Sequence, residues 1–168
     1  KAATENCGRI VTYALLIDQT PEIVRQFSQV TRKENFLSTT YEDDADKQVF
    51  AADFILRRAK RDVESGKDVV DSLTSLSHLY NETEQSSGGK VLVGGLESKT
   101  LQYIKKYFGA ARALEEKGSL TIIAALSTAT GNPADELLCT ELSALSNLEV
   151  HLSEELSTKH IYPAFDYS

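Results

Sequence analysis

Two acidic side chains follow apolar runs of the sequence at points where chemistry could occur. Asp18 follows the nearly unbroken apolar run of residues 10–17, and Asp71 follows two valines. Asp71 is itself followed by Ser72 and Thr74, and an acid with neighbouring hydroxyls at the end of a strand can reach a nucleotide-bound magnesium ion. An acid that caps a helix beginning just after it explains the same spacing equally well.

The dipeptide Asp18-Gln19 is expected at the tip of the first strand, where it could orient a water molecule or a metal ion. Gln19 cannot act as a general base, because an amide does not take up a proton at neutral pH. At most it positions a water molecule. A polar loop without chemistry accounts for the two residues as well.

A phosphate-cradling loop of the type G-x-x-x-x-G-K-[ST] does not occur in the sequence. The glycines that come closest lack the required order and do not join a strand directly to a helix: Gly88, Gly89, Gly94 and Gly95. They predict an exposed loop over residues 81–95 with a mobile backbone. The printed residues therefore cannot hold ATP in the manner of that loop.

A set of lysines near the glycines could meet the phosphates of RNA: Lys90, Lys99, Lys105 and Lys106. Solvated lysines on an exposed helix face are the favoured alternative. Three histidines, His78, His151 and His160, are too scattered to form a ligand set. We expect surface or packing roles for them and assign them no metal.

Apolar runs alternate with helical spacings along the chain. Strands are predicted over residues 10–17, 36–41, 67–71, 120–126 and 148–152, with a final extended piece over 161–167. Helices are predicted over residues 20–30, 46–65, 73–80 and 101–117, the last closed by Gly118, and a short one after Asn132.

Strands that alternate with helices indicate an α/β fold with a mainly parallel sheet and helices on both faces. Ligands gather at the carboxyl ends of the strands in such folds. Asp18, Asp71 and Thr128 fall at or near such ends. With Ser72, which follows Asp71, they are our candidates for contacts to a nucleotide.

Composition restricts the possible functions less than the motifs do. The chain has 168 residues, 41% of them apolar, which suits one globular domain over residues 1–168. Its net charge of -7 disfavours non-specific coating of nucleic acid. No apolar run approaches a membrane span or a signal peptide, so we expect a cytoplasmic protein. Cys7 and Cys139 are interpreted as buried thiols.

Several stretches together resemble the ATPase domain of the transcription termination factor Rho family. They are LLIDQTPE, VVDSLTSLSHLYN, GKVLVGGL, YFGAARALEEKGSLTIIA, NLEVHL and IYPAFDY, and they cover the chain from Leu15 to Tyr167 in matching order. The resemblance implies a RecA-like P-loop NTPase core, assembled as a hexameric ring that uses ATP and Mg²⁺ to pull on RNA. It implies RNA and further copies of the chain as partners, and also an RNA polymerase complex.

The resemblance also assigns roles to individual residues. Asp71 matches the magnesium-linked acid, and Gln19 stands where the family has the glutamate that activates the attacking water. The loop that enters the pore of the ring and touches RNA matches Lys90, Val91, Gly94 and Gly95.

The sequence departs from the family pattern at several charged positions. Ser75, His78 and His160 stand where the family has arginines, and Pro133 stands where it has a lysine. The family also places a few more apolar residues directly before Asp71. We expect the phosphate-binding loop to precede Lys1 and the arginine finger to follow Ser168, so that the printed residues are a fragment of the domain.

The leading hypothesis is therefore an ATP-dependent RNA translocase or helicase domain that acts in transcription termination. Its main rival is a related ring protein that binds RNA or has a structural role without ATP turnover, which the departures from the pattern favour. A third reading is an α/β binding module that shares only the fold.

Overall fold

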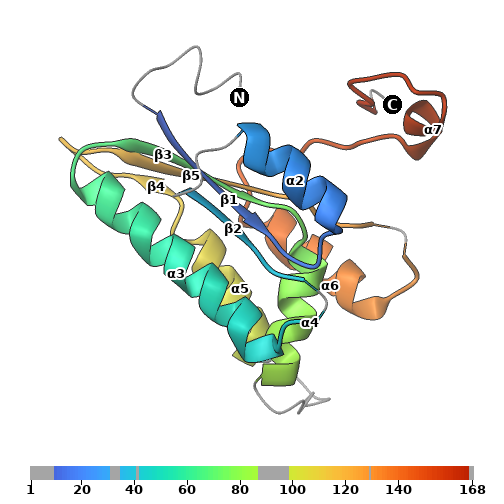
Figure 1. The fold of residues 1–168 in the computed structure, drawn as a ribbon, viewed down its shortest axis with the longest axis horizontal. Coiled ribbons are helices and arrows are strands. Elements are labelled where there is room, and N and C mark those ends of the chain that lie inside the picture. Colours follow the sequence, from blue (N-terminus) through green and yellow to red (C-terminus); the bar gives the residue numbers. More distant parts are fainter. Residues whose placement is uncertain (1–9, 31–34, 41, 87–98, 129, 167–168) are drawn as a thin grey trace.

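The computed structural model describes residues 10–30, 35–40, 42–86, 99–128 and 130–166. These residues form a five-stranded sheet of order β2-β1-β3-β5-β4 (Figure 1). Its strands are β1 (Ile10–Leu16), β2 (Phe36–Ser38), β3 (Asp68–Leu73), β4 (Arg112–Ala113) and β5 (Ser119–Ala124).

The sheet is mainly parallel, as the sequence predicts. β1 pairs in parallel with β2 and with β3, and β3 pairs in parallel with β5. Only the short β4 is antiparallel, to β5. In this register Asp71 of β3 lies between Tyr13 of β1 and Ile122 of β5.

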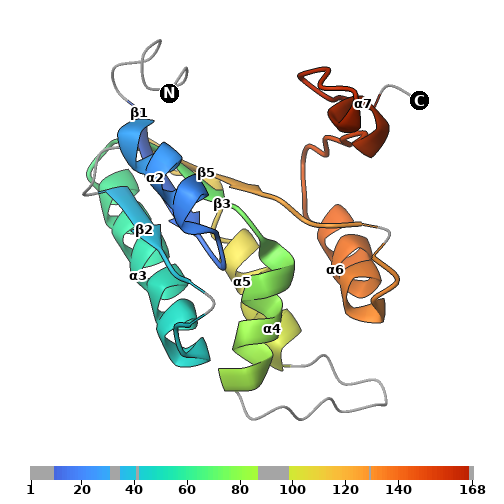
Figure 2. The ribbon, with the colours of Figure 1, turned by 45° about the vertical axis from the view of Figure 1, so that its right-hand side comes forward.

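Helices lie on both faces of the sheet. They are α2 (Pro21–Val30), α3 (Ala45–Glu64), α4 (Leu76–Ser86), α5 (Lys99–Phe108), α6 (Pro133–Ser143) and α7 (Glu154–Thr158). Figures 1 and 2 show α3, α4 and α5 on one face and α2 beside β1 on the other. The side chains of Ala14 and Leu16 lie on the face of β1 that points away from α3. They are nevertheless buried, which agrees with α2 covering that face.

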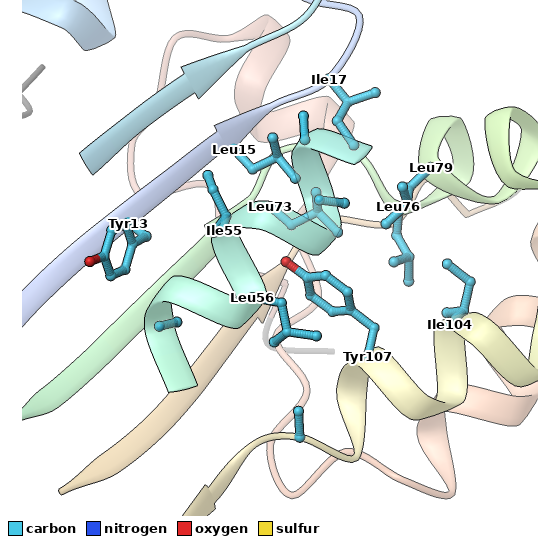
Figure 3. Packing of buried hydrophobic residues seen from close by; sticks show 14 of the residues in the cluster. Tyr13, Leu15, Ile17, Ile55, Leu56, Leu73, Leu76, Leu79, Ile104 and Tyr107 are labelled. Atoms are coloured by element: carbon cyan, nitrogen blue, oxygen red, sulfur yellow. The ribbon is translucent and has the colours of Figure 1, made fainter. Parts of the chain in front are cut away.

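The main core lies between the sheet and helices α3, α4 and α5 (Figure 3). Alternate residues of β1 and β3 point into it, as period-two side-chain alternation requires. The largest fully buried side chains include Tyr13, Leu15, Ile17, Ile55, Leu73, Leu76, Leu79, Ile104 and Tyr107. The predicted α/β fold, a mainly parallel sheet with helices on both faces, is therefore confirmed.

Two helix ends follow their expected signals. Gly66 has a φ of 93° just after α3, where the left-handed backbone is free of strain only for glycine. Asn132 caps α6, because its side-chain oxygen accepts a hydrogen bond from the Ala134 N–H at 3.0 Å, and Pro133 is the first helical residue.

Several expected element boundaries are wrong, among them the ends of β2 at Ser38 and of β5 at Ala124. β3 continues past Asp71 to Leu73, and α4 begins only at Leu76. Residues 81–86, expected in a loop, extend α4 to Ser86. The predicted helix over 101–117 ends at Phe108, because β4 and the hairpin to β5 take its last part.

The C-terminal segment also differs from its prediction. Residues 148–152 form no strand, and Leu152 makes only an isolated antiparallel pairing with Phe165. Figure 2 shows the segment around α7 standing apart from the sheet and its helices. Among the residues described, none of the helices combines the length and apolar character that crossing a bilayer requires.

Candidate functional site

The carboxyl ends of β1 and β3 meet at one edge of the sheet because the two strands are parallel. Thr74, the residue after β3, ties them together. Its hydroxyl accepts a hydrogen bond from the Ile17 N–H at 3.2 Å and donates to the Leu15 carbonyl at 3.5 Å. Residues just beyond both strands are therefore held close to one another.

Asp18 projects from this edge toward α4. Its Oδ2 atom lies 3.2 Å from Nδ1 of His78, in the first turn of α4. Asp18 has a φ of 51°, in the left-handed region where aspartate is tolerated better than most residues. The two side chains remain partly accessible, with 29% of Asp18 and 46% of His78 exposed.

Glu82 lies one helical turn after His78 on α4. Burial raises the pKa of its carboxyl group, the negative charge of Asp18 raises it further, and His78 lowers it. The carboxyl group of Glu82 is therefore sensitive to both members of the pair.

Gln19, the predicted water-positioning residue, follows directly after Asp18. Its amide Nε2 donates a hydrogen bond to the Ile17 carbonyl at 3.1 Å. The amide is thus turned back onto the strand that precedes it. Its proposed role stays a prediction, and this contact does not support it.

Asp71 lies inside β3 and not at its end, so the placement expected for it is wrong. It is completely buried, and its Oδ2 atom accepts a hydrogen bond from the Tyr107 hydroxyl at 2.7 Å. Figure 3 shows the Tyr107 side chain reaching from α5 toward the sheet. The alternative of a helix cap is wrong too, because β3 continues to Leu73 before α4 begins.

The surroundings of Asp71 are unfavourable to a negative charge. Burial raises the pKa of its carboxyl group to about 6, against the opposing effect of the Tyr107 hydrogen bond. Among the residues described, its Oδ1 atom has no hydrogen-bond partner. Burial of Tyr107, and then its contact with Asp71, raise the pKa of that phenol well above its ordinary value.

The structure does not bring Asp18 and Asp71 together. Asp71 is level with Tyr13 in the sheet, and Asp18 comes after the end of β1 at Leu16. At about 3.3 Å per residue of strand, the end of β1 lies about 10 Å beyond the level of Asp71 along the sheet. A single crevice shared by both side chains is therefore not formed.

Asp71 as placed does not fit a magnesium ligand. Mg²⁺ keeps several water molecules when it binds a carboxylate, which a fully buried side chain cannot accommodate. The described part of the chain also contains no group of three or more histidine, cysteine or acidic residues that could hold a metal ion. The predicted role of Asp71 therefore has no geometric support here.

The other candidates for a nucleotide contact do not lie together at the edge. Ser72 is half-buried and level with Ala14 and Ile123, one residue from Asp71 and so on the opposite face of the sheet. Thr128 is exposed in the segment that follows β5. Their roles stay predictions.

The predicted RNA contacts Lys90, Val91, Gly94 and Gly95 lie outside the described residues. Of the other lysines considered, Lys105 forms an ion pair with Glu141 at 2.6 Å, while Lys99 and Lys106 are exposed. Cys139 is a free, half-buried cysteine, and Cys7 is not among the described residues.

An open hollow of about 520 Å³ occurs elsewhere, in the C-terminal segment. Its lining includes Leu152, Ser157 and Tyr162. This segment stands apart from the strand ends (Figure 2), and its lining is mainly apolar. The carboxyl edge of the sheet therefore remains the better candidate for chemistry, since it gathers the titratable groups.

The sequence alone does not indicate the pairing of Asp18 with His78. The residues are far apart in sequence, and only the parallel pairing of β1 with β3 brings them together. The sequence does indicate one part of this cluster, because His78 and Glu82 stand four residues apart and so share a helix face.

No protein-family model matches the chain. Curated relatives are closely similar. Transcription termination factor Rho of Escherichia coli strain K12 is 40% identical over 161 residues, which is 94% of this chain and 38% of that protein. Rho of Haemophilus influenzae is 38% identical over 99% of this chain and 40% of its own length, and Rho of Neisseria gonorrhoeae is 40% identical over 97% and 39%.

Solved structures share the fold at lower identity. A prototypical ATPase from the type III secretion system of pathogenic bacteria has a TM-score of 0.76 and 20% identity, covering 93% of this chain and 47% of its own. The assembled ATPase EscN from the type III secretion system of enteropathogenic E. coli has a TM-score of 0.73 and 21% identity, covering 94% and 40%. The chain thus has a RecA-like P-loop ATPase fold, and in sequence it is similar over nearly its whole length to transcription termination factor Rho, of which it spans about two fifths.

Proposed function

We propose that this chain is a domain of an ATP-dependent RNA translocase or helicase that acts in transcription termination. The observation that carries the proposal is the 38–40% identity to Rho proteins over 94–99% of the chain. The mainly parallel sheet, with polar side chains at its carboxyl edge, supports a nucleotide as the ligand of this edge.

The proposal includes an assembly with further copies of the chain, by resemblance a hexameric ring. EscN, a neighbour in fold, is described as an assembled ATPase. In such a ring RNA passes the loop that contains Lys90, Val91, Gly94 and Gly95, and the lysine charge attracts the phosphates. An RNA polymerase complex is the proposed larger partner.

ATP is the proposed nucleotide, bound at the carboxyl edge of the sheet. Asp18 is accessible there, and Ser72 and Thr128 are the other candidate contacts. The sequence contains no phosphate-cradling loop, so these residues would contribute only part of the site.

A second candidate function is a Rho-related ring protein that binds RNA without ATP turnover. Two contacts favour it. The Gln19 amide is engaged by the Ile17 carbonyl and can take up no proton, and Asp71 is buried against Tyr107. Gln19 therefore supplies no proton acceptor at the edge of the sheet, and Asp71 lies inside the sheet.

The test is ATP hydrolysis by the full-length protein, measured with and without single-stranded RNA. We expect RNA-stimulated hydrolysis in the parent. A Gln19→Glu variant adds a carboxylate that can accept a proton, and Gln26→Glu, at an exposed position of α2, is the matched control for the added charge.

The outcomes separate the two functions. Hydrolysis in the parent supports the translocase and excludes the inactive ring. No parental hydrolysis, with a gain in Gln19→Glu but not in Gln26→Glu, supports the inactive ring. If the full-length protein binds RNA but no ATP, the translocase is excluded and the ring protein without ATP turnover stands.

A further inference from the structure

The pair formed by Asp18 and His78 has the geometry of an oriented proton acceptor. The Nδ1 atom of His78 lies 3.2 Å from a carboxylate oxygen of Asp18. A neutral imidazole that carries its proton on Nδ1, the atom that faces Asp18 here, has a lone pair on Nε2. Among the residues described, no hydrogen bond or ion pair to Nε2 of His78 is found, so this atom can receive a proton from a ligand.

The backbone around the pair is well fixed. Thr74 joins the ends of β1 and β3 through its hydroxyl, and the His78 N–H donates to the Ser75 hydroxyl at 3.4 Å. Asp18 adopts its left-handed φ of 51° at the very point where it meets His78.

Carboxyl groups flank the His78 side chain. Asp18 lies directly beside its Nδ1 atom, and Glu82 lies on the same face of α4 within electrostatic reach of both. In the serine hydrolases a carboxylate likewise faces Nδ1 of the imidazole base.

The neighbouring Gln19 cannot perform this task. Its amide takes up no proton, and its Nε2 donates to the Ile17 carbonyl. His78 is accessible at the same edge of the sheet, with 46% of its side chain exposed. It is the group at this edge whose type, orientation and accessibility together suit a general base.

We propose that His78, oriented by Asp18, accepts the proton of the water molecule that attacks the terminal phosphate of ATP. The inference rests on the proposed function and adds a catalytic residue to it. The water oxygen forms a bond to the terminal phosphorus, and the bond from that phosphorus to the bridging oxygen breaks. ADP leaves with the electron pair of that bond, and the water proton moves to Nε2 of His78. Asp18 is a positioning residue.

The test is the rate of RNA-stimulated ATP hydrolysis in the full-length protein with His78→Ala. We expect kcat to fall on the order of 100-fold, the usual contribution of a general base, with little change in KM. Free imidazole added to the buffer should restore part of the lost rate, because it supplies the missing proton acceptor. His151→Ala is the matched control, since His151 is exposed beside Glu149 in the C-terminal segment.

A His78→Arg variant separates proton uptake from simple positive charge. Arginine stays protonated at neutral pH, so we expect this variant to be as slow as His78→Ala. If His78→Arg keeps the parental rate, His78 acts as a cation toward phosphate and the inference is overturned. Asp18→Asn should lower kcat by a smaller factor than His78→Ala does. Added imidazole should not raise its rate, because the proton acceptor His78 remains in place.

Two further outcomes decide whether the inference and the proposed function stand. If the parent hydrolyses ATP and His78→Ala does so at the same rate, the inference is overturned while the proposed function stands. If the parent binds ATP and RNA without hydrolysis, both are overturned. Nucleotide binding and circular dichroism of each variant show whether a slow variant is folded, and a loss confined to kcat supports the inference.

Discussion

Asp71 carries an ionisable group into the core at a position level with Tyr13 and Ile122. Burial raises the pKa of this carboxyl group from its ordinary value of 3.8 to about 6. The folded chain therefore binds this proton more tightly than the unfolded chain does. The stabilising effect of the proton is complete below the unfolded value and is lost as the pH rises through about 6.

A neutral residue at this position should remove that pH dependence. The unfolding free energy of Asp71→Asn should rise relative to that of the parent by about 2 kcal/mol between pH 4 and pH 7, since each pKa unit corresponds to about 1.4 kcal/mol and part of the effect is already lost at pH 4. Urea unfolding followed by far-ultraviolet circular dichroism measures it, because the chain has no tryptophan. An unchanged difference across this range would contradict the buried placement of Asp71.

Single residues show where prediction from sequence succeeds and fails. Asn132 and Gly66 act through their nearest neighbours along the chain, and their roles in ending or capping helices were predicted correctly. The position of Asp71 depends on where β3 ends, and two valines before the acid do not determine this. The contact between Asp18 and His78 depends on the pairing of strands, which no local signal contains.

At the scale of elements, the turn after α3 and the hairpin between β4 and β5 approach each other closely. A Cβ atom on Gly118 would lie 1.8 Å from the Lys67 carbonyl oxygen. The Gly118 N–H also donates to the Val63 carbonyl at 3.2 Å. Gly118 is thus required by the approach of two backbones and not, as the sequence suggested, by the end of a helix.

Replacement of this glycine should be costly. We expect Gly118→Ala to lower the unfolding free energy by about 3 kcal/mol, because overpacking forces the backbone of one turn to move. Gly66→Ala is the control, since its added Cβ would meet no atom within 4 Å and only its φ of 93° is unfavourable. That variant should lose only about 1 kcal/mol. Equal losses in the two variants would refute the close approach.

Elements with strong periodic patterns were predicted well, and short elements were not. β1 and α3 have long apolar runs or repeats that suit a single structure, and both formed where expected. Residues 148–152 alternate like a strand, but a strand requires a partner, and among the described residues only Leu152 pairs with another segment. Alternation alone therefore could not establish this element.

At the scale of the whole molecule, one side of the sheet is incompletely covered. β4 pairs with only Leu120 and Ser119 of β5, so the remainder of that edge has no partner strand among the described residues. Ile123 of β5 is 57% exposed. Other large apolar side chains are exposed in the C-terminal part: Leu145, Leu148, Val150, Leu152, Ile161 and Tyr162.

An exposed apolar strand at an open edge promotes association between copies of a chain. We expect the isolated chain of residues 1–168 to self-associate at micromolar concentrations, and Ile123→Lys to raise the monomer fraction in sedimentation velocity. The unfolding free energy should change by no more than about 0.5 kcal/mol, because the residue is exposed. Arg57→Lys, on an exposed part of α3, is the control. Equal association of both variants would show that β5 is not the surface involved.

The most direct test of the central claim is the displacement of a DNA strand annealed to RNA by the full-length protein. A translocase that pulls on RNA should release the DNA strand with ATP and should release none with a non-hydrolysable ATP analogue. Release that is equal with ATP, with the analogue and without nucleotide, or no release at all under conditions where RNA and ATP bind, would contradict the account.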